Sequence, residues 1–438
     1  MGAGIVAAVS RDEPTARPAL GPSVVGELDA ILRDGDLEHD RSFPGDRPTR
    51  QPVHSVYVPA DRAGAGTARD WGAQALAALE EYAPHAATLA AATGLDGALV
   101  DRVYPRVLAK LARQPIEDLR IDLEDGYGAR DDATEDRDAV AAGAALAAIA
   151  SSEGAPVMLG VRAKGLEPST RSRGVRTLDL VLGSALDAAG GAGLPEGWVV
   201  TLPKVTRVAQ VEAMIVLCER LEAAHGLSAG RLRFELQIET PQAVLGPDGA
   251  ATLARMVHAA AGRCVGLHFG TYDFAAALGV AAAEQSLDHP LADHAKSVML
   301  LATAGTGVRV SDGSTNVLPV GGQAGVHAAW ALHVRLIRRS LARALYQGWD
   351  LHPAQLPTRF LATYAFYVQA LPAAAERLRA YVGGGAGTGV LDEPATAQAL
   401  AGVIVRALDC GAVDVEEVTR LTGLDRSVLD ALARRRVG

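Results

Sequence analysis

The chain has 438 residues, of which 49% are apolar, so it is long enough to bury a large core and does not have the composition of a disordered protein. Its formal net charge of -9 at pH 7 argues against nucleic acid or anionic lipid as a partner of the whole surface. The 3 cysteines show no paired spacing. They therefore argue against a disulfide framework and a structural zinc site, and they indicate a reducing compartment.

The N-terminal segment carries neither the basic start nor the long apolar run of a secretory signal. Apolar stretches elsewhere are Ala-rich and soon broken by charge, so none is expected to span a membrane. We therefore expect a cytoplasmic protein that binds no membrane and no nucleic acid. Residues 1–52 are rich in Arg, Asp, Pro and Gly, with one helix-like patch near 24–32, and predict an N-terminal arm.

From residue 54 onward, short apolar or β-branched runs recur, each typical of a strand. The eight candidates are 54–59, 119–123, 157–161, 198–202, 233–238, 264–269, 307–310 and 347–351. Ala-rich stretches with helical spacing lie between them, at 134–151, 208–224, 250–261, 294–303 and 325–346. This alternation predicts parallel βαβ units and favours an α/β fold of the (β/α)₈ TIM-barrel type over an open doubly wound sheet.

Two further segments extend this barrel. The connection 60–118 is long enough for two or three helices and predicts a helical insertion after strand one. Residues 415–436 read as two short helices, which superficially resemble a helix-turn-helix, although the acidic balance of the chain favours a helical tail packed on the barrel. We predict an arm at 1–52, a catalytic barrel domain at 53–370 and a helical C-terminal extension at 371–438.

Polar side chains follow the expected strands at their carboxyl ends, which form the working face of such a barrel. They include Glu124, Asp125, Arg162, Lys204, Glu239 and Asp273. Any one of them can instead cap a helix or satisfy a loop amide, but their convergence on one mouth favours function. Carboxylates at the ends of buried strands are costly unless a cation meets them, so the acidic members suggest a metal site.

Magnesium prefers hard oxygen ligands and usually takes only one or two carboxylates from the protein. Glu239 and Asp273, on adjacent expected strands, fit that requirement, with Mn²⁺ as an alternative metal. The absence of a His cluster or a paired-cysteine motif argues against zinc.

Seven segments resemble, in order, the citrate lyase β-subunit and malyl-CoA lyase-like group of the HpcH/HpaI aldolase superfamily. They are 56–62, 122–130, 161–162, 202–205, 238–240, 266–273 and 351–355. The resemblance extends from about residue 54 to about residue 400 and is weak only at the seventh strand. The chain reads as a divergent, longer member, with Ala163 where relatives usually carry Asn.

This resemblance implies a Mg²⁺-dependent carbon-carbon lyase or aldolase. Its substrate would be a 2-keto or hydroxy acid, free or as an acyl-CoA, and its chemistry would pass through a metal-stabilised enolate. Glu239 and Asp273 would hold the metal, and Arg162 would bind the keto or carboxylate oxygen. Glu124 and Asp125 would order metal-bound water near the substrate.

Lys204 is expected to act as a supporting cation beside the substrate. A covalent Schiff-base role is one alternative, and simple pairing with Glu239 or Glu124 is another.

The segment 390–394 resembles the C-terminal motif of the same group, in which an aspartate reaches the active site of a neighbouring subunit and transfers a proton. Asp392 is therefore a candidate catalytic acid, and a homo-oligomer, a trimer or hexamer, is expected. An N-cap for a helix beginning near Pro394 is the alternative role of Asp392.

Two other functions stay open. One is a phosphotransferase that uses phosphoenolpyruvate on a related barrel, and the other is a non-catalytic barrel subunit.

Overall fold

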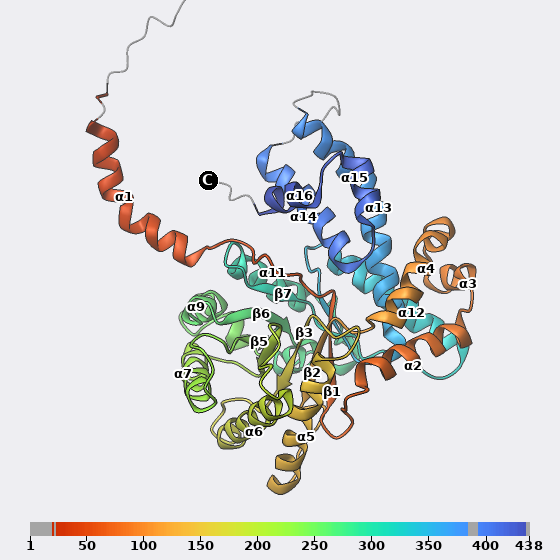
Figure 1. Cartoon of the computed structure of the whole chain (residues 1–438), viewed down its shortest axis with the longest axis horizontal. Coiled ribbons are helices and arrows are strands. Elements are labelled where there is room, and N and C mark those ends of the chain that lie inside the picture. The colour runs from red at the N-terminus through yellow and green to blue at the C-terminus, as the bar shows by residue number, and fades with distance from the viewer. Residues whose placement is uncertain (1–19, 22, 384–392, 435–438) are drawn as a thin grey trace, which may run out of the picture. The chain divides into compact units, whose positions relative to one another are not determined.

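Eight parallel strands form the centre of the computed structural model, which describes residues 20–21, 23–383 and 393–434. Neighbouring strands follow the order β7-β6-β5-β4-β3-β2-β1-β8. A parallel bridge between Ser311 and Gln347 joins the two ends of this order, and the Asp312 amide donates a 2.8 Å hydrogen bond to the Gln347 carbonyl there. The expected TIM barrel is therefore confirmed (Figure 1).

All eight expected strands are present, with ends within two residues of the predicted runs. They are β1 (His54–Pro59), β2 (Asp118–Asp122), β3 (Met158–Arg162), β4 (Trp198–Leu202), β5 (Phe234–Ile238), β6 (Cys264–Phe269), β7 (Arg309–Ser311) and β8 (Gly348–Asp350). The prediction succeeded because strands buried on both faces of a parallel barrel are marked by compact runs of apolar and β-branched residues.

The interior of the barrel is polar, in contrast to its outer side. Arg120 on β2 contacts Glu235 on β5, with 2.8 Å between Nη2 and Oε2, although three strand pairings separate them in the sheet. Both side chains therefore point inward, and the residues next to them, such as Leu119 and Leu236, point outward and are buried.

Helices surround the strands, as Figure 1 shows for α5, α6, α7 and α9. The connections contain α5 (Asp132–Ala150), α6 (Arg171–Ala189), α7 (Val208–Ala224), α8 (Pro241–Val244), α9 (Thr252–Ala259), α10 (Thr271–Ala277), η1 (Ala282–Glu284), α11 (Pro290–Thr303) and α12 (Gln323–Leu341). Their apolar faces cover the outer side of the sheet and complete the core, as at Leu146, Val181 and Met214.

The connection after β1 contains α2 (Thr67–Tyr82), α3 (Ala86–Thr93) and α4 (Gly97–Arg113), which confirms the helical insertion. The helix α4 begins where the side chain of Asp96 accepts a 2.9 Å hydrogen bond from the amide of Leu99.

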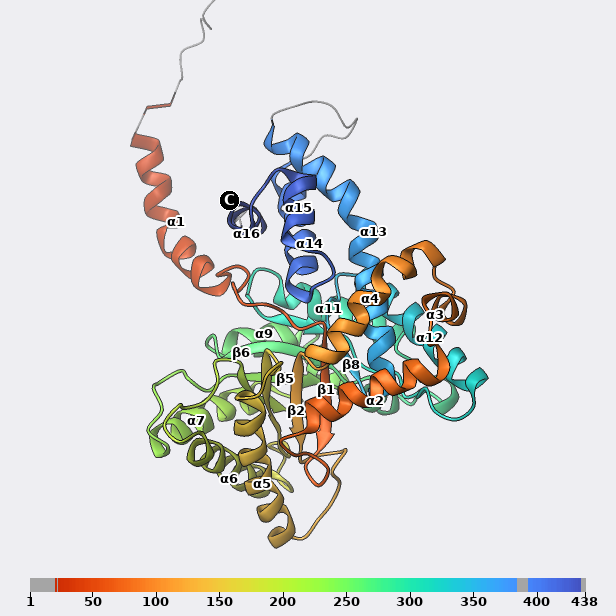
Figure 2. The same ribbon diagram turned by 45° about the vertical axis from the view of Figure 1, so that its right-hand side comes forward.

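The helical extension is also confirmed. After η2 (Pro353–Gln355) come α13 (Leu356–Val382), α14 (Pro394–Cys410), α15 (Val415–Thr422) and α16 (Arg426–Ala433). Figure 2 shows α14 and α15 beside α13, and Tyr364 of α13 donates a 2.9 Å hydrogen bond to the carbonyl of Cys410. The last two helices bury Val418 and Leu429, as expected for a packed tail.

The structure separates the residues up to Pro44 from a compact unit that begins at Gly45. The N-terminal part contains α1 (Ser23–Ser42), which is longer than the expected patch at 24–32. The division of the chain at 52/53 and 370/371 stays a prediction. None of the helices in the described residues has both the length and the apolar character needed to cross a membrane.

Candidate active site

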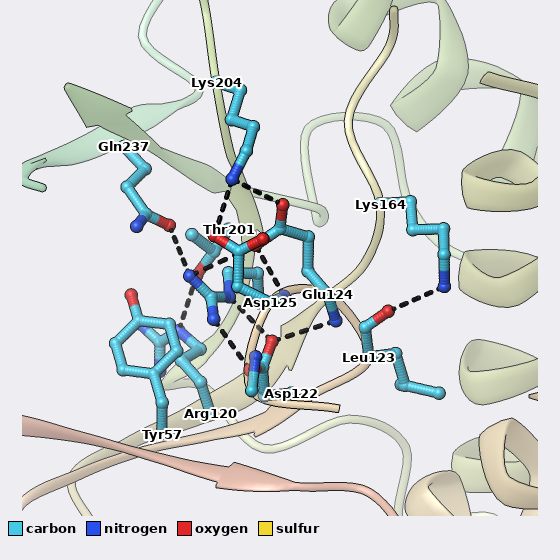
Figure 3. A network of polar contacts seen from close by, with 12 residues as sticks. Tyr57, Arg120, Asp122, Leu123, Glu124, Asp125, Lys164, Thr201, Lys204 and Gln237 are labelled. Carbon is cyan, nitrogen blue, oxygen red and sulfur yellow. Dashed lines mark hydrogen bonds and ion pairs between the residues drawn. The ribbon is translucent and has the colours of Figure 1, made fainter. Parts of the chain in front are cut away.

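Four carboxylates surround Lys204, which follows the end of β4. Figure 3 shows two of them, Glu124 and Asp125, beside its ammonium group. Its ammonium nitrogen lies 2.9 Å from Glu124 Oε1, 2.5 Å from Asp125 Oδ2 and 3.7 Å from Asp273 Oδ2. Its backbone amide donates a 2.7 Å hydrogen bond to Glu239 Oε1. Lys204 thus contacts all four carboxylates that the sequence analysis names here.

The backbone of Lys204 has a φ of 51°, in the left-handed region that residues with a side chain rarely adopt. Such strain persists where the surroundings impose it, and it occurs often at functional sites. Burial opposes the charge, but the carboxylates of Glu239, Asp125 and Glu124 raise the pKa of Lys204 above its ordinary value. A lysine held in its charged form is a poor nucleophile, which argues against the Schiff-base alternative.

Arg162 ends β3 and lies almost completely buried below this group of carboxylates. Its Nε and Nη2 donate to the two carboxylate oxygens of Asp122, each at 2.7 Å. Nη1 donates to Gln237 Oε1 at 3.1 Å and lies 3.4 Å from Glu124 Oε2. Most of its five N–H donors are therefore already committed to protein groups.

Two aromatic rings fix the plane of the same guanidinium. The ring of Tyr57 lies 4.8 Å from it, and that of Trp349 lies 5.5 Å away. Because a guanidinium is attracted to the faces of aromatic rings, these contacts hold Arg162 in one orientation.

Asp122 organises the loop that follows β2. Besides pairing with Arg162, its carboxylate accepts hydrogen bonds from the amides of Glu124, at 3.0 Å, and Gly126, at 2.8 Å. The amide of Asp125 in turn donates to Glu124 Oε2 at 2.8 Å. These bonds give Glu124 and Asp125 their positions, so Asp122 acts on the site through its neighbours.

Glu239 follows β5 and is only 1% exposed. Gln237 Nε2 donates a 2.8 Å hydrogen bond to its Oε2. Gly270 is required beside it, because a Cβ at that position would lie 2.4 Å from the Glu239 Cβ. Burial, together with the charges of Glu124 and Asp273, raises the pKa of Glu239 to about 8, although Lys204 and Arg162 act in the opposite direction.

This raised pKa predicts that metal binding depends on pH. Because Glu239 is protonated below about pH 8, a cation that binds its carboxylate must release a proton. We expect the apparent affinity for Mg²⁺ to rise by up to about tenfold per pH unit from pH 6 to 8 and then level off. The metal-free protein should lose stability over the same range, because its folded-state pKa exceeds the unfolded value.

Titration calorimetry at pH 6, 7, 8 and 9, in buffers with different ionisation enthalpies, measures both the affinity and the protons released. An affinity that does not change below pH 8 would contradict the assignment of Glu239 as a ligand.

A second group of possible metal ligands lies inside the barrel. Among the described residues, Asp118, Glu235 and His268 bring their ligand atoms within 4.8 Å of one another. Arg120 already pairs with both carboxylates, and His268 Nε2 lies 2.9 Å from Glu235 Oε2. A metal would have to displace a buried guanidinium, so this group reads as an internal ion network. His268 belongs to this network through its contact with Glu235.

The structure thus brings together six of the seven site residues named from the sequence: Glu124, Asp125, Arg162, Lys204, Glu239 and Asp273. Their roles stay predictions. Asp392 lies outside the described residues. No role was assigned to Asp122 or Gln237 from the sequence. A signal was present, because Asp122 comes two residues after the inward-facing Arg120 on β2, and Gln237 comes two residues after the inward-facing Glu235 on β5.

Comparison with solved structures supports the fold. A citrate lyase from Burkholderia xenovorans LB400 is similar with a TM-score of 0.55 and 19% identity, covering 87% of this chain and 99% of that one. At the level of the fold, this confirms the resemblance to the citrate lyase-like group.

Two further structures show lower TM-scores. CitE from Mycobacterium tuberculosis, in complex with magnesium, acetoacetate and coenzyme A, has a TM-score of 0.45 and 18% identity, covering 86% of this chain and 100% of that one. The magnesium and glyoxylate complex of Haloferax volcanii malate synthase has a TM-score of 0.45 and 15% identity, covering 89% of this chain and 99% of that one.

No curated protein matches the sequence. A family model described as a domain of unknown function, DUF6986, matches residues 32–437. This match includes the whole barrel and the helical extension up to the end of α16. The chain therefore belongs to the DUF6986 family.

Proposed function

We propose that the protein is a Mg²⁺-dependent carbon-carbon lyase or aldolase that acts on a 2-keto or hydroxy acid, free or as a CoA thioester, through an enolate. The observation that carries the proposal is the group of four carboxylates around one cation at the carboxyl ends of the strands. The likeness of the fold to a citrate lyase supports it.

The donor set fits magnesium. Glu239 and Asp273 follow adjacent strands and offer carboxylate oxygens, and the ammonium of Lys204 shows that a cation is accommodated among these side chains. Glu239 and Asp273 would hold the metal, whereas Glu124 and Asp125 would hold its water. Bound there, Mg²⁺ would supply positive charge that stabilises negative charge on a substrate oxygen.

Arg162 contributes a second fixed positive charge. Its guanidinium is held by Asp122 and by two aromatic rings, so little reorganisation is needed when charge develops on the substrate. The donors that protein groups leave free would contact the keto or carboxylate oxygen.

We further propose Asp392 as the acid that transfers a proton, supplied by a neighbouring subunit in a trimer or hexamer. This assignment rests on the resemblance of segment 390–394 to the C-terminal motif of the citrate lyase-like group. Unimpaired turnover by an Asp392→Asn variant would contradict this assignment.

Proton exchange tests the function without knowledge of the natural acceptor. Pyruvate and acetyl-CoA are incubated with the protein in deuterated buffer, with and without Mg²⁺, and the methyl signals are followed by NMR. We expect Mg²⁺-dependent loss of at least one methyl signal, and stabilisation by Mg²⁺ with oxalate in thermal unfolding. Phosphate release from phosphoenolpyruvate would favour the phosphotransferase, and metal binding without exchange would favour the non-catalytic subunit.

Lys204→Met should tighten metal binding. The ammonium of Lys204 competes with a metal for Glu124, Asp125 and Asp273, so its removal should lower the dissociation constant for Mg²⁺ or Mn²⁺ by about tenfold, a change of about 1.4 kcal/mol. The metal-free variant should unfold at a lower temperature, because its carboxylates then repel one another.

Titration calorimetry with each metal and thermal unfolding measure the two effects. Lys164→Met is a matched control, because Lys164 pairs with Glu135 at 2.5 Å outside this group of carboxylates. Unchanged or weaker metal binding by Lys204→Met would show that the lysine does not compete with the metal.

A further inference from the structure

A large cavity lies at the opposite end of the barrel from the candidate active site. Its volume is about 440 Å³, within the range of small-molecule sites. The barrel contributes Arg309, the first residue of β7, and Tyr346, which comes just before β8. The segment before β1 forms a second side, and α14 and α16 of the helical extension close the third.

The charged lining is basic, although the whole chain is acidic. Among the described residues, five arginines line the cavity, Arg47, Arg309, Arg406, Arg426 and Arg434, against three aspartates, Asp46, Asp409 and Asp430. Two of the arginines pair with two of the aspartates. Arg426 lies 2.7 Å from Asp409 and 3.0 Å from Asp430, and Arg434 lies 3.7 Å from Asp430.

The other three arginines share a different environment. In the described part of the chain, no ion pair joins a carboxylate to Arg47, Arg309 or Arg406. Burial and the charges of Arg47 and Arg406 lower the pKa of Arg309 to about 10, although Asp46 and Asp409 act in the opposite direction. Arg47 and Arg406 are therefore each close enough to Arg309 to repel its positive charge.

Neutral groups hold these arginines in place. Arg47 donates to the carbonyls of Gly262 and Gly307, at 2.9 and 3.1 Å. Arg309 donates to the carbonyl of Arg50 at 2.8 Å and to the hydroxyl of Thr49 at 2.7 Å.

The guanidinium of Arg406 lies 4.4 Å from the centre of the Tyr346 ring. Positive charge is thus fixed beside the cavity by neutral groups, without an ion pair to these three arginines in the described residues.

The rest of the lining includes small and apolar side chains. On α14, Ala395, Ala399 and Gly402 face the cavity at helical spacing, and Val308 and Leu300 add apolar surface from the barrel side. An apolar body therefore has room beside the charged end.

We propose that this cavity binds a small organic anion, with a phosphate or polycarboxylate head on Arg47, Arg309 and Arg406 and an apolar body along α14. Guanidinium forks match both kinds of oxyanion. Because the parallel strands place the candidate active site at their other ends, the ligand would be an effector and not the substrate. It would bridge the barrel to the helical extension and so stabilise the contact between them.

The test is binding to the full-length protein without Mg²⁺. Inorganic phosphate, AMP and citrate are titrated by calorimetry and thermal unfolding at constant ionic strength set with chloride. We expect saturable binding of at least one organic anion. Preference for AMP would identify a phosphate ester, and preference for citrate a polycarboxylate.

Two variants locate the site. Arg406→Gln should weaken binding about tenfold or more, the effect of losing a charge-assisted hydrogen bond. Ala399→Phe should abolish binding by filling the cavity while leaving every charge in place. The exposed Arg420 on α15 lies outside the cavity, so Arg420→Gln is the matched control and should bind normally.

The absence of saturable binding by all three probes would overturn the proposal, as would binding that both cavity variants retain. Equal weakening by Arg420→Gln would also overturn it, because attraction would then be a property of the general surface. The proposed lyase function is tested separately, because Asp273→Asn should leave anion binding at this cavity intact.

Discussion

Arg162→Met should lower the free energy of unfolding by roughly 3–5 kcal/mol and abolish proton exchange, because it leaves a buried carboxylate without its partner. The side chain of Asp122 is only 1% exposed and takes both of its 2.7 Å charged hydrogen bonds from Arg162. The hydrogen bonds that Asp122 also accepts from loop amides cannot replace the lost positive charge. Urea unfolding measures the stability, and NMR measures the exchange.

A double variant separates the fold from the chemistry. Arg162→Met combined with Asp122→Asn removes both charges, so it should recover much of the lost stability but none of the exchange. Arg176→Met is the surface control: Arg176 also pairs with an aspartate, Asp136 at 2.6 Å, but its side chain is 60% exposed. The free energy of unfolding should fall far less in Arg176→Met than in Arg162→Met. Normal exchange by Arg162→Met would remove the guanidinium from the mechanism.

The barrel could be predicted from the sequence because its signals are local. A compact apolar run marks each strand, and Ala-rich helical spacing marks the connections, so neither prediction requires distant contacts. The arm was harder, because α1 continues to Ser42 through a segment rich in charge that shows no apolar periodicity.

The gathering of the site residues could also be predicted, since the carboxyl ends of parallel strands meet at one face. Arg162, Lys204 and Glu239 each end or follow a strand, and their contacts here require only that rule. Asp312 shows the limit of this rule. It also follows a strand, yet its carboxylate pairs with Lys296 at 3.0 Å and accepts a bond from Ser340, outside this group of carboxylates.

The polar interior of the barrel was missed, although the sequence contained a signal for it. Asp118, Arg120 and Asp122 stand at every second position of β2, and the period of a strand places them on one face. Which partners they find could not be predicted, because Glu235 lies 115 residues from Arg120 in the chain.

Asp273→Asn is expected to separate metal binding from stability most cleanly. The side chain of Asp273 is 52% exposed in the first turn of α10, and its ion-pair contact with Lys204 spans 3.7 Å. Its removal should therefore shift the midpoint of thermal unfolding of the metal-free protein by no more than about 2 °C. Affinity for Mg²⁺ or Mn²⁺ should fall by at least about 100-fold, since even groups behind metal ligands contribute 10–100-fold.

Glu239→Gln should lose metal affinity to a similar degree, but as a buried residue it also changes the unliganded protein. The raised pKa of Glu239 makes the neutral form common near neutral pH, so the glutamine should stabilise the metal-free protein above pH 8. Asp70 offers a matched control for Asp273: it also lies in the first turn of a helix, α2, and is 58% exposed. If Asp273→Asn binds metal and exchanges protons as well as Asp70→Asn does, then the carboxylates around Lys204 form an ion network like the one inside the barrel. The metal-dependent function would then have no ligands at this mouth.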